Sequence, residues 1–160
     1  MFRLRFTFTK ESPIRFLSHL DMMKLMERAL RRAELPVLFS QGHTPRMKLS
    51  LAWPLSVGMT AAAEYADVVL EKWIAADKIP ALLNYVMPAG CRVTDAKMVD
   101  MKQDSLTAQV TAARWEVTPE PGAPVQEMTL PAGPKENTRI QDMFPKTALL
   151  HRAALIGKFS

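Results

Sequence analysis

A serine, a histidine and an aspartate stand close together in the segment Ser18-His19-Leu20-Asp21. These side chains form the nucleophilic triad of many hydrolases, where the histidine lies between the other two. Successive residues of a helix diverge by about 100°, so His19 and Asp21 would point to nearly opposite sides. The quartet therefore cannot form a triad by itself, and we assign no catalytic residue.

The same spacing is typical of a helix N-terminus. In a capping box, a serine accepts the backbone N–H three positions on, and an acidic residue there accepts the N–H of the serine. We expect Ser18 and Asp21 to form this pair. The cap does not require a histidine, so we expect His19, with Gln41, Gly42 and His43 of a Gly/Pro-punctuated loop, to line a pocket or contact a partner.

The cap predicts a helix from about residue 19 to 33. An apolar side contains Leu20, Met23, Met26 and Leu30 at helical spacing. The other side contains Arg28, Arg31 and Arg32, which we expect to contact phosphates. An ordinary solvated helix face is the alternative.

Two extended segments supply more cations. Residues 2–9 alternate between apolar residues and Arg3 or Arg5, and residues 47–51 follow Arg46 and include Lys48. If both strands join one sheet, these four cations share its open face. That face lacks an aromatic pair for base stacking. The predicted nucleic-acid-binding residues are Arg3, Arg5, Arg15, Arg28, Arg31, Arg32, Arg46 and Lys48.

The charge of the chain is concentrated in its first third. The net charge is +5, and residues 1–50 hold ten Lys/Arg against four Asp/Glu. Such asymmetry indicates an anionic partner such as RNA. One cysteine excludes an internal disulfide, and three scattered histidines lack metal-site spacing, so we expect no metal and no cofactor bound by this chain. Without a signal peptide or membrane span, a cytoplasmic protein is expected.

The elements that must position these residues suggest an α+β fold. Strands are predicted at 2–9, 47–51, 64–71 and 91–99, and a second helix from a cap at Asp77 to Val86. Together with the short β-prone run at 37–39 the order is βαβββαβ, or βαββαβ if 47–51 and 64–71 belong to one long bent strand. The latter order is the ferredoxin-like split βαβ arrangement, an antiparallel sheet with two helices on one face. An extra strand at 105–117 would complete a domain at 1–118, followed by a Pro/Gly-rich connection and irregular tail at 119–160.

Residues 14–70 resemble the radical-SAM-linked protein family, a bacterial domain of unknown function that occurs free-standing or fused to radical SAM enzymes. The likeness rests on an R-[FL]-x-SHLD-[LM] block, an ERALRRA block, an S-x-G loop, a PL-x-[LV]-G turn and an E-x-x-D strand. The matching positions are Arg15, Ser18, His19, Leu20, Asp21, Glu27, Arg28, Ala29, Arg31, Arg32, Ser40, Gly42, Pro45, Pro54, Leu55, Gly58, Glu64 and Asp67. The loop departs from the pattern at His43-Thr44 and Arg46-Met47.

The resemblance implies association with a radical SAM enzyme in RNA- or translation-related chemistry. An iron–sulfur cluster needs three or more cysteine ligands, so Cys91 alone cannot hold one and that chemistry would occur on a partner. Our leading hypothesis is a non-catalytic, RNA-binding accessory domain. The alternatives are a protein-interaction module that docks on the radical SAM enzyme through Met22, Met23, Met26 and the tail, and a nuclease or transferase that uses His19 and nearby carboxylates.

Overall fold

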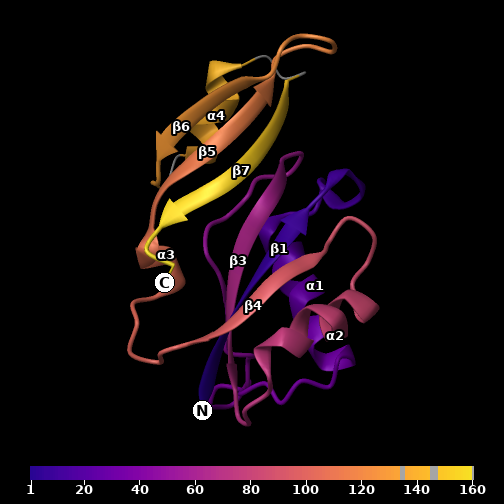
Figure 1. Ribbon diagram of the computed structural model, residues 1–160, viewed down its shortest axis with the longest axis vertical. Coiled ribbons are helices and arrows are strands. Elements are labelled where there is room, and N and C mark those ends of the chain that lie inside the picture. Colours follow the sequence, from indigo (N-terminus) through magenta and orange to yellow (C-terminus); the bar gives the residue numbers. More distant parts are fainter. Residues whose placement is uncertain (134–135, 145–147, 160) are drawn as a thin grey trace.

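The computed structural model describes residues 1–133, 136–144 and 148–159, and shows an α+β protein. Seven strands form one mostly antiparallel sheet, and the described residues include four α-helices. The strands lie in two groups, β1, β3 and β4 beside α1 and α2, and β5, β6 and β7 beside α4 (Figure 1). None of the described helices combines the length and the apolar character needed to span a membrane.

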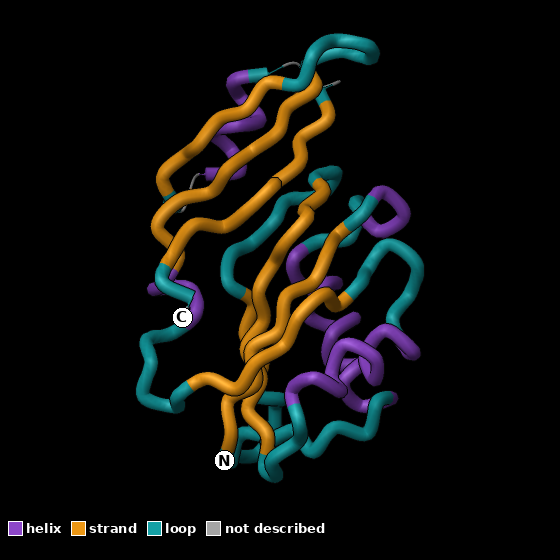
Figure 2. Tube along the Cα trace, viewed as in Figure 1, coloured by secondary structure: helices purple, strands orange, loops and turns teal. Residues whose placement is uncertain are grey.

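The first group of strands forms around β1 (Phe2–Lys10), in which Leu4, Phe6 and Phe8 are buried on one face. It pairs antiparallel with β3 (Thr60–Leu70) on one side and β4 (Val93–Val99) on the other, and β2 (Leu49–Leu51) pairs with β3. Within this group the strand order is β4-β1-β3-β2, and each neighbouring pair is antiparallel. Helices α1 (His19–Arg32) and α2 (Ile79–Val86) share one hydrophobic core with these strands, so both cover the same face (Figure 2).

The chain then extends the sheet beyond a simple ferredoxin-like arrangement. A short helix α3 (Leu106–Gln109) leads into β5 (Val110–Thr118), which pairs antiparallel with β6 (Gln126–Pro131) and β7 (Leu149–Gly157). Along the chain, α4 (Glu136–Met143) lies between β6 and β7. Strand β7 also pairs in parallel with the first residues of β3, which joins the two groups. A second core around Trp115 lies in this part.

The prediction of an irregular segment after residue 118 is therefore wrong for most of it. Strands β6 and β7 and helix α4 lie within 119–160, and β7 is an interior strand between β3 and β5. The proline and glycine residues that suggested irregular structure stand mainly in the turns and in the segment around 134–135, which lies outside the described residues. Pairing with distant strands orders the rest.

Two further local predictions differ from the structure. Leu20, expected in the core, has 69% of its surface exposed because it stands two positions before the buried Met22, about 200° around the helix axis. Asp77 does not cap α2; it lies inside a short 3₁₀ turn (Ala76–Lys78), and Lys78 precedes the helix without a side-chain cap.

Candidate nucleic-acid interface

Helix α1 begins with the expected capping box. The hydroxyl of Ser18 accepts the backbone N–H of Asp21 at 3.2 Å, and the Asp21 carboxylate accepts the backbone N–H of Ser18 at 3.3 Å. The hydrogen bonds from Ser18 lower the pKa of Asp21. Because Ser18 and Asp21 are engaged with each other, their side chains define where the helix starts and are not aimed at a substrate.

The outer face of α1 contains the three predicted arginines. Its inner face buries Met22, Leu25, Met26, Ala29 and Leu30, the spacing of one amphipathic stripe. Arg28, Arg31 and Arg32 lie off that stripe and are exposed. These cations are therefore available to an anionic partner.

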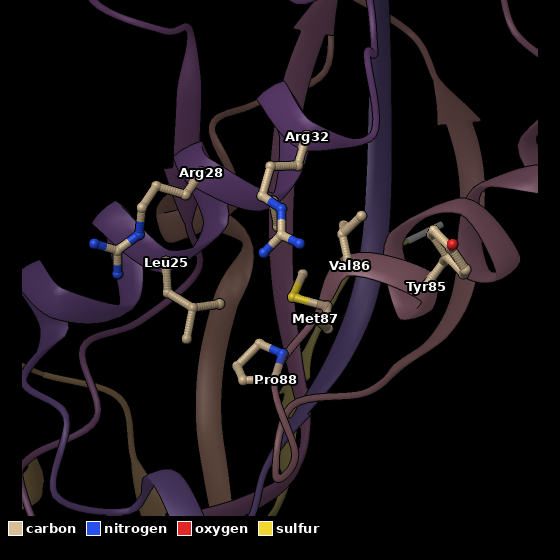
Figure 3. A pocket seen from close by; sticks show the side chains of 8 residues that line it. Leu25, Arg28, Arg32, Tyr85, Val86, Met87 and Pro88 are labelled. Carbon is tan, nitrogen blue, oxygen red and sulfur yellow. The ribbon is translucent and has the colours of Figure 1, made fainter.

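A groove of about 410 Å³ runs between the outer side of α1 and the end of α2 (Figure 3). It is lined by Leu25, Arg28, Ala29, Arg32, Tyr85, Val86, Met87 and Pro88. Arg28 and Arg32 reach the groove from α1, and Tyr85 comes from α2 on the other side (Figure 3). Tyr85 is 92% exposed, which is unusual for a large aromatic side chain.

Tyr85 lines more than this one groove. A second hollow of about 410 Å³ shares Arg32, Tyr85 and Val86 with the first and is otherwise lined by Ala33, Glu34, Ala81 and Leu82. One exposed ring thus borders two hollows, and Arg32 borders both. Guanidinium groups bind phosphate oxygens, and an exposed ring stacks on a base, so this arrangement suits a single-stranded nucleic acid.

Arg5 is not available for phosphate contact, contrary to our prediction. It is 1% exposed, and its guanidinium donates to both carboxylate oxygens of Asp67, at 2.8 and 2.9 Å. A further N–H donates to Oε1 of Gln109 in α3 at 2.9 Å. The face of β1 that was expected to be open is covered here by α3 and by Phe159, whose ring stacks on Tyr65.

The other predicted cations are divided between regions of the molecule. Arg3 donates to the backbone carbonyls of Met101 and Gln103, so part of its hydrogen-bonding capacity is used. Arg15 is half-buried, 4.7 Å from the ring of Phe16. Arg46 and Lys48 are exposed. Arg3 pairs with Val69 of β3, and the N–H of Val69 donates to the carbonyl of Lys48 on the other side of that strand. Arg3 and Lys48 therefore lie on the sheet face away from the helices. The α1 arginines instead point out from the helix layer.

The loop and His19 do not form a common pocket. Gln41, Gly42 and His43 are exposed in a loop closed by two hydrogen bonds between Ser40 and Arg46. That hairpin meets the C-terminal end of α1, where Arg31 lies 5.8 Å from the ring of Phe39. His19 is at the opposite end of a 14-residue helix, about 21 Å away.

His19 instead lines a small cavity with Lys10 and Glu64, together with Phe8, Met22, Leu51, Trp53 and Leu55. Burial, and next the positive charge of Lys10, lowers the pKa of His19. Burial lowers the pKa of Lys10 to about 8, an effect that Glu64 opposes and Arg152 reinforces. Burial raises the pKa of Glu64, while the guanidinium of Arg152 acts in the opposite direction.

The two buried carboxylates that the nuclease or transferase hypothesis would use both form ion pairs with arginine. Glu64 accepts two hydrogen bonds from Arg152, at 2.8 and 2.7 Å, and Asp67 accepts two from Arg5. Burial raises the pKa of Cys91 to about 12, which disfavours a thiolate. Within the described part of the chain, no cluster of three or more His, Cys, Asp or Glu residues could hold a metal ion.

Tyr85 and Lys10 are the site residues that the sequence analysis missed. Tyr85 follows Leu83 by two positions in α2, so a helical wheel anchored on the buried Ile79 and Leu83 would have placed it outside the core. Lys10 is the last residue of β1, and the neighbouring sequence does not indicate that its side chain is buried.

The sequence profile of a family described as an uncharacterized protein conserved in bacteria (DUF2344) matches residues 3–150. This match covers both groups of strands, from β1 into β7. No curated protein matches the chain.

Proposed function

We propose that this chain, which belongs to the bacterial family DUF2344, is a non-catalytic accessory domain that binds single-stranded RNA and assists a radical SAM enzyme. The observation that carries the RNA-binding role is the groove between α1 and α2, which is lined by Arg28 and Arg32 of α1 and by the exposed Tyr85 of α2. The radical SAM partner rests on the resemblance of residues 14–70 alone. In the same proposal, residues 2–99 form a ferredoxin-like unit, supported by the strand order β4-β1-β3-β2, and the protein acts in the cytoplasm.

The charge distribution supports an RNA ligand over a neutral one. The net charge is +5, and the exposed cations of the groove lie in the first third of the chain, where the excess is concentrated. Affinity of this kind depends on phosphate contacts and falls steeply with salt. The base contact through Tyr85 would tolerate any sequence, because every base has a face on which a ring can stack.

Replacing Tyr85 by alanine should weaken binding of a single-stranded oligonucleotide by about 5- to 150-fold, the loss of one stacking contact worth about 1–3 kcal/mol. Tyr85→Phe should bind like the wild type, since the ring remains. Fluorescence anisotropy with a labelled oligouridine, measured at several salt concentrations, gives both affinities. Equal binding by Tyr85→Ala and the wild type, or binding insensitive to salt, would contradict the proposal.

Docking on the radical SAM enzyme is a second candidate role, although two of the three methionines predicted for it are buried. Met22 and Met26 are 4% and 0% exposed in the core and cannot reach a partner. Phe16, Leu20 and Val57 are instead 66%, 69% and 51% exposed near the start of α1. The N–H of Gly58 donates to the carbonyl of Arg15, which brings Val57 near Phe16. Exposed apolar side chains gathered in this way are typical of a protein-interaction surface.

Leu20→Glu should abolish co-purification with a tagged radical SAM enzyme from the same bacterium while leaving the fold intact, because the side chain already faces solvent. Val125→Glu is the matched control, since Val125 is 58% exposed in a loop before β6. Loss of the complex in both variants, or in neither, would argue against this surface. Deletion of residues 136–160 would not test docking, because it removes the interior strand β7.

A further inference from the structure

The last residues that the structure describes lie on the sheet face away from α1 and α2. Arg5 of β1 stands opposite Asp67 of β3 and Lys97 of β4, so these three side chains share that face. Tyr65, two positions before Asp67 in β3, lies on it as well. Residues 158–159, here called the C-terminal segment, follow β7 directly and reach this face.

The C-terminal segment makes two contacts of the kind that a nucleotide would make in its place. The ring of Phe159 stacks on the ring of Tyr65, with 4.3 Å between the centroids and 17° between the planes. The ammonium of Lys97 donates a hydrogen bond to the backbone carbonyl oxygen of Phe159 at 2.6 Å. A nucleobase also stacks on a tyrosine ring, and a phosphate oxygen accepts from an ammonium more strongly than a neutral carbonyl does.

A basic hollow lies next to this contact. Its volume is about 270 Å³, and it is lined by Lys102, Gln103, Asp104, Gln109 and Lys158. Two of the lining residues are cations and one is an anion, and Arg3 donates to the backbone carbonyl of Gln103 nearby. A strand with one base on Tyr65 would therefore have cations beside it for its phosphates.

The way in which the C-terminal segment is held allows a ligand to replace it. The N–H of Lys158 donates to the carbonyl of Gln109 in α3 at 3.3 Å. At Gly157, the last residue of β7, a Cβ atom would lie 2.2 Å from that carbonyl oxygen, so the segment docks only because glycine precedes it. Phe159 and Tyr65 are both only partly buried, so a ligand can reach their contact from solvent.

We infer that Tyr65 and Lys97 form a second binding site for single-stranded RNA, and that the C-terminal segment closes this site. When the segment leaves, one base stacks on Tyr65 in place of Phe159, and a phosphate of the strand lies on the Lys97 ammonium. RRM domains also stack RNA bases on aromatic side chains of a sheet. The inference rests on the proposed function for the identity of the ligand, but the site lies on the opposite face of the sheet from the α1–α2 groove.

Fluorescence anisotropy with a labelled oligouridine tests the site through the ring that closes it. Phe159→Ala should bind the oligonucleotide about two- to tenfold more tightly than the wild type, because no ring then competes for Tyr65. Tyr65→Ala/Phe159→Ala should lose this gain, since the stacking surface is gone. Phe16→Ala removes a ring that is 66% exposed elsewhere and should bind like the wild type.

A second variant opens the site without removing any group that would contact RNA. Gly157→Ala places a Cβ against the carbonyl of Gln109, which should push the C-terminal segment off the sheet. This variant should also bind oligouridine more tightly than the wild type, whereas Tyr65→Ala/Gly157→Ala should not.

The gain from Phe159→Ala should persist in an Arg28→Ala/Arg32→Ala background, because the two sites lie on opposite faces of the sheet. Equal affinity of Phe159→Ala and the wild type would overturn the inference, and so would a gain that remains without Tyr65 or that disappears in the groove background. If the groove variants bind RNA like the wild type while the Phe159→Ala gain still depends on Tyr65, the second site stands and only the α1–α2 groove is wrong.

Discussion

Glu64→Gln should lower the free energy of unfolding by about 3–5 kcal/mol, the largest stability effect expected of any single substitution discussed for this protein. Glu64 is the buried partner of Arg152, with both carboxylate oxygens accepting N–H groups of the guanidinium. Glutamine has nearly the same shape but no charge, so the buried cations Arg152 and Lys10 would lose the negative charge of Glu64. Arg152 also donates to the carbonyls of Trp53 and Pro54 and therefore cannot turn outward freely.

Chemical denaturation followed by far-UV circular dichroism measures this effect. Glu127→Gln removes an exposed carboxylate from β6 and should change stability by less than about 0.5 kcal/mol. The double variant Glu64→Leu/Arg152→Met should lose much less than Glu64→Gln, because apolar side chains replace both charges. A Glu64→Gln protein as stable as the wild type would show that the pair does not hold β3 and β7 together.

Removing both groove arginines, as Arg28→Ala/Arg32→Ala, should weaken binding of single-stranded RNA about a hundredfold or more. Each charge-assisted hydrogen bond to a phosphate contributes about 1.5–3 kcal/mol. The slope of log K against log salt should also become shallower by about 1.4, because two fewer counterions are displaced from a single strand. Fluorescence anisotropy across a salt series measures both quantities.

The matched control is Arg92→Ala/Arg114→Ala, which removes two exposed arginines outside the groove, one just before β4 and one in β5. It changes the net charge by the same amount, so it should reduce affinity only slightly through the long-range field. If both double variants lose the same affinity and the same salt slope, RNA binds to the overall charge and not to the groove.

Local patterns along the chain predicted the elements whose partners are close in sequence. The capping box at Ser18 and Asp21 placed the first residue of α1, and the alternation in residues 2–9 predicted β1. Both signals are intrinsic to the segment, because a cap and a period-two strand are satisfied by near neighbours.

Elements held by distant pairing were not predicted. Strand β7 is ordered between β3 and β5, and the sequence of 149–157 contains no signal for either partner. The burial of Arg5 has the same cause: its polar face looked open, but α3 supplies Gln109 and the chain end supplies Phe159 to cover it. The position of a charged residue in a strand therefore predicts which face of the sheet its side chain lies on, but it does not predict whether that face is exposed to solvent.

The candidate site follows the same division. The arginines of α1 were correctly expected on the outer helix face, because amphipathic spacing fixes the inner one. Their combination with Tyr85 depends on how α2 packs beside α1, which no spacing in either segment encodes. His19 was expected to line a pocket, yet its neighbours Lys10 and Glu64 come from two strands that the fold brings together.

Photo-cross-linking of the full chain to an oligouridine containing 4-thiouridine, followed by mass spectrometry of tryptic peptides, tests the central claim most directly. The proposal predicts saturable cross-links in the peptide 79–92, which contains Tyr85, and in the peptides of α1 next to Arg28 and Arg32. Cross-links confined to the 41–48 loop or to β1, or none that compete with unlabelled RNA, would contradict it.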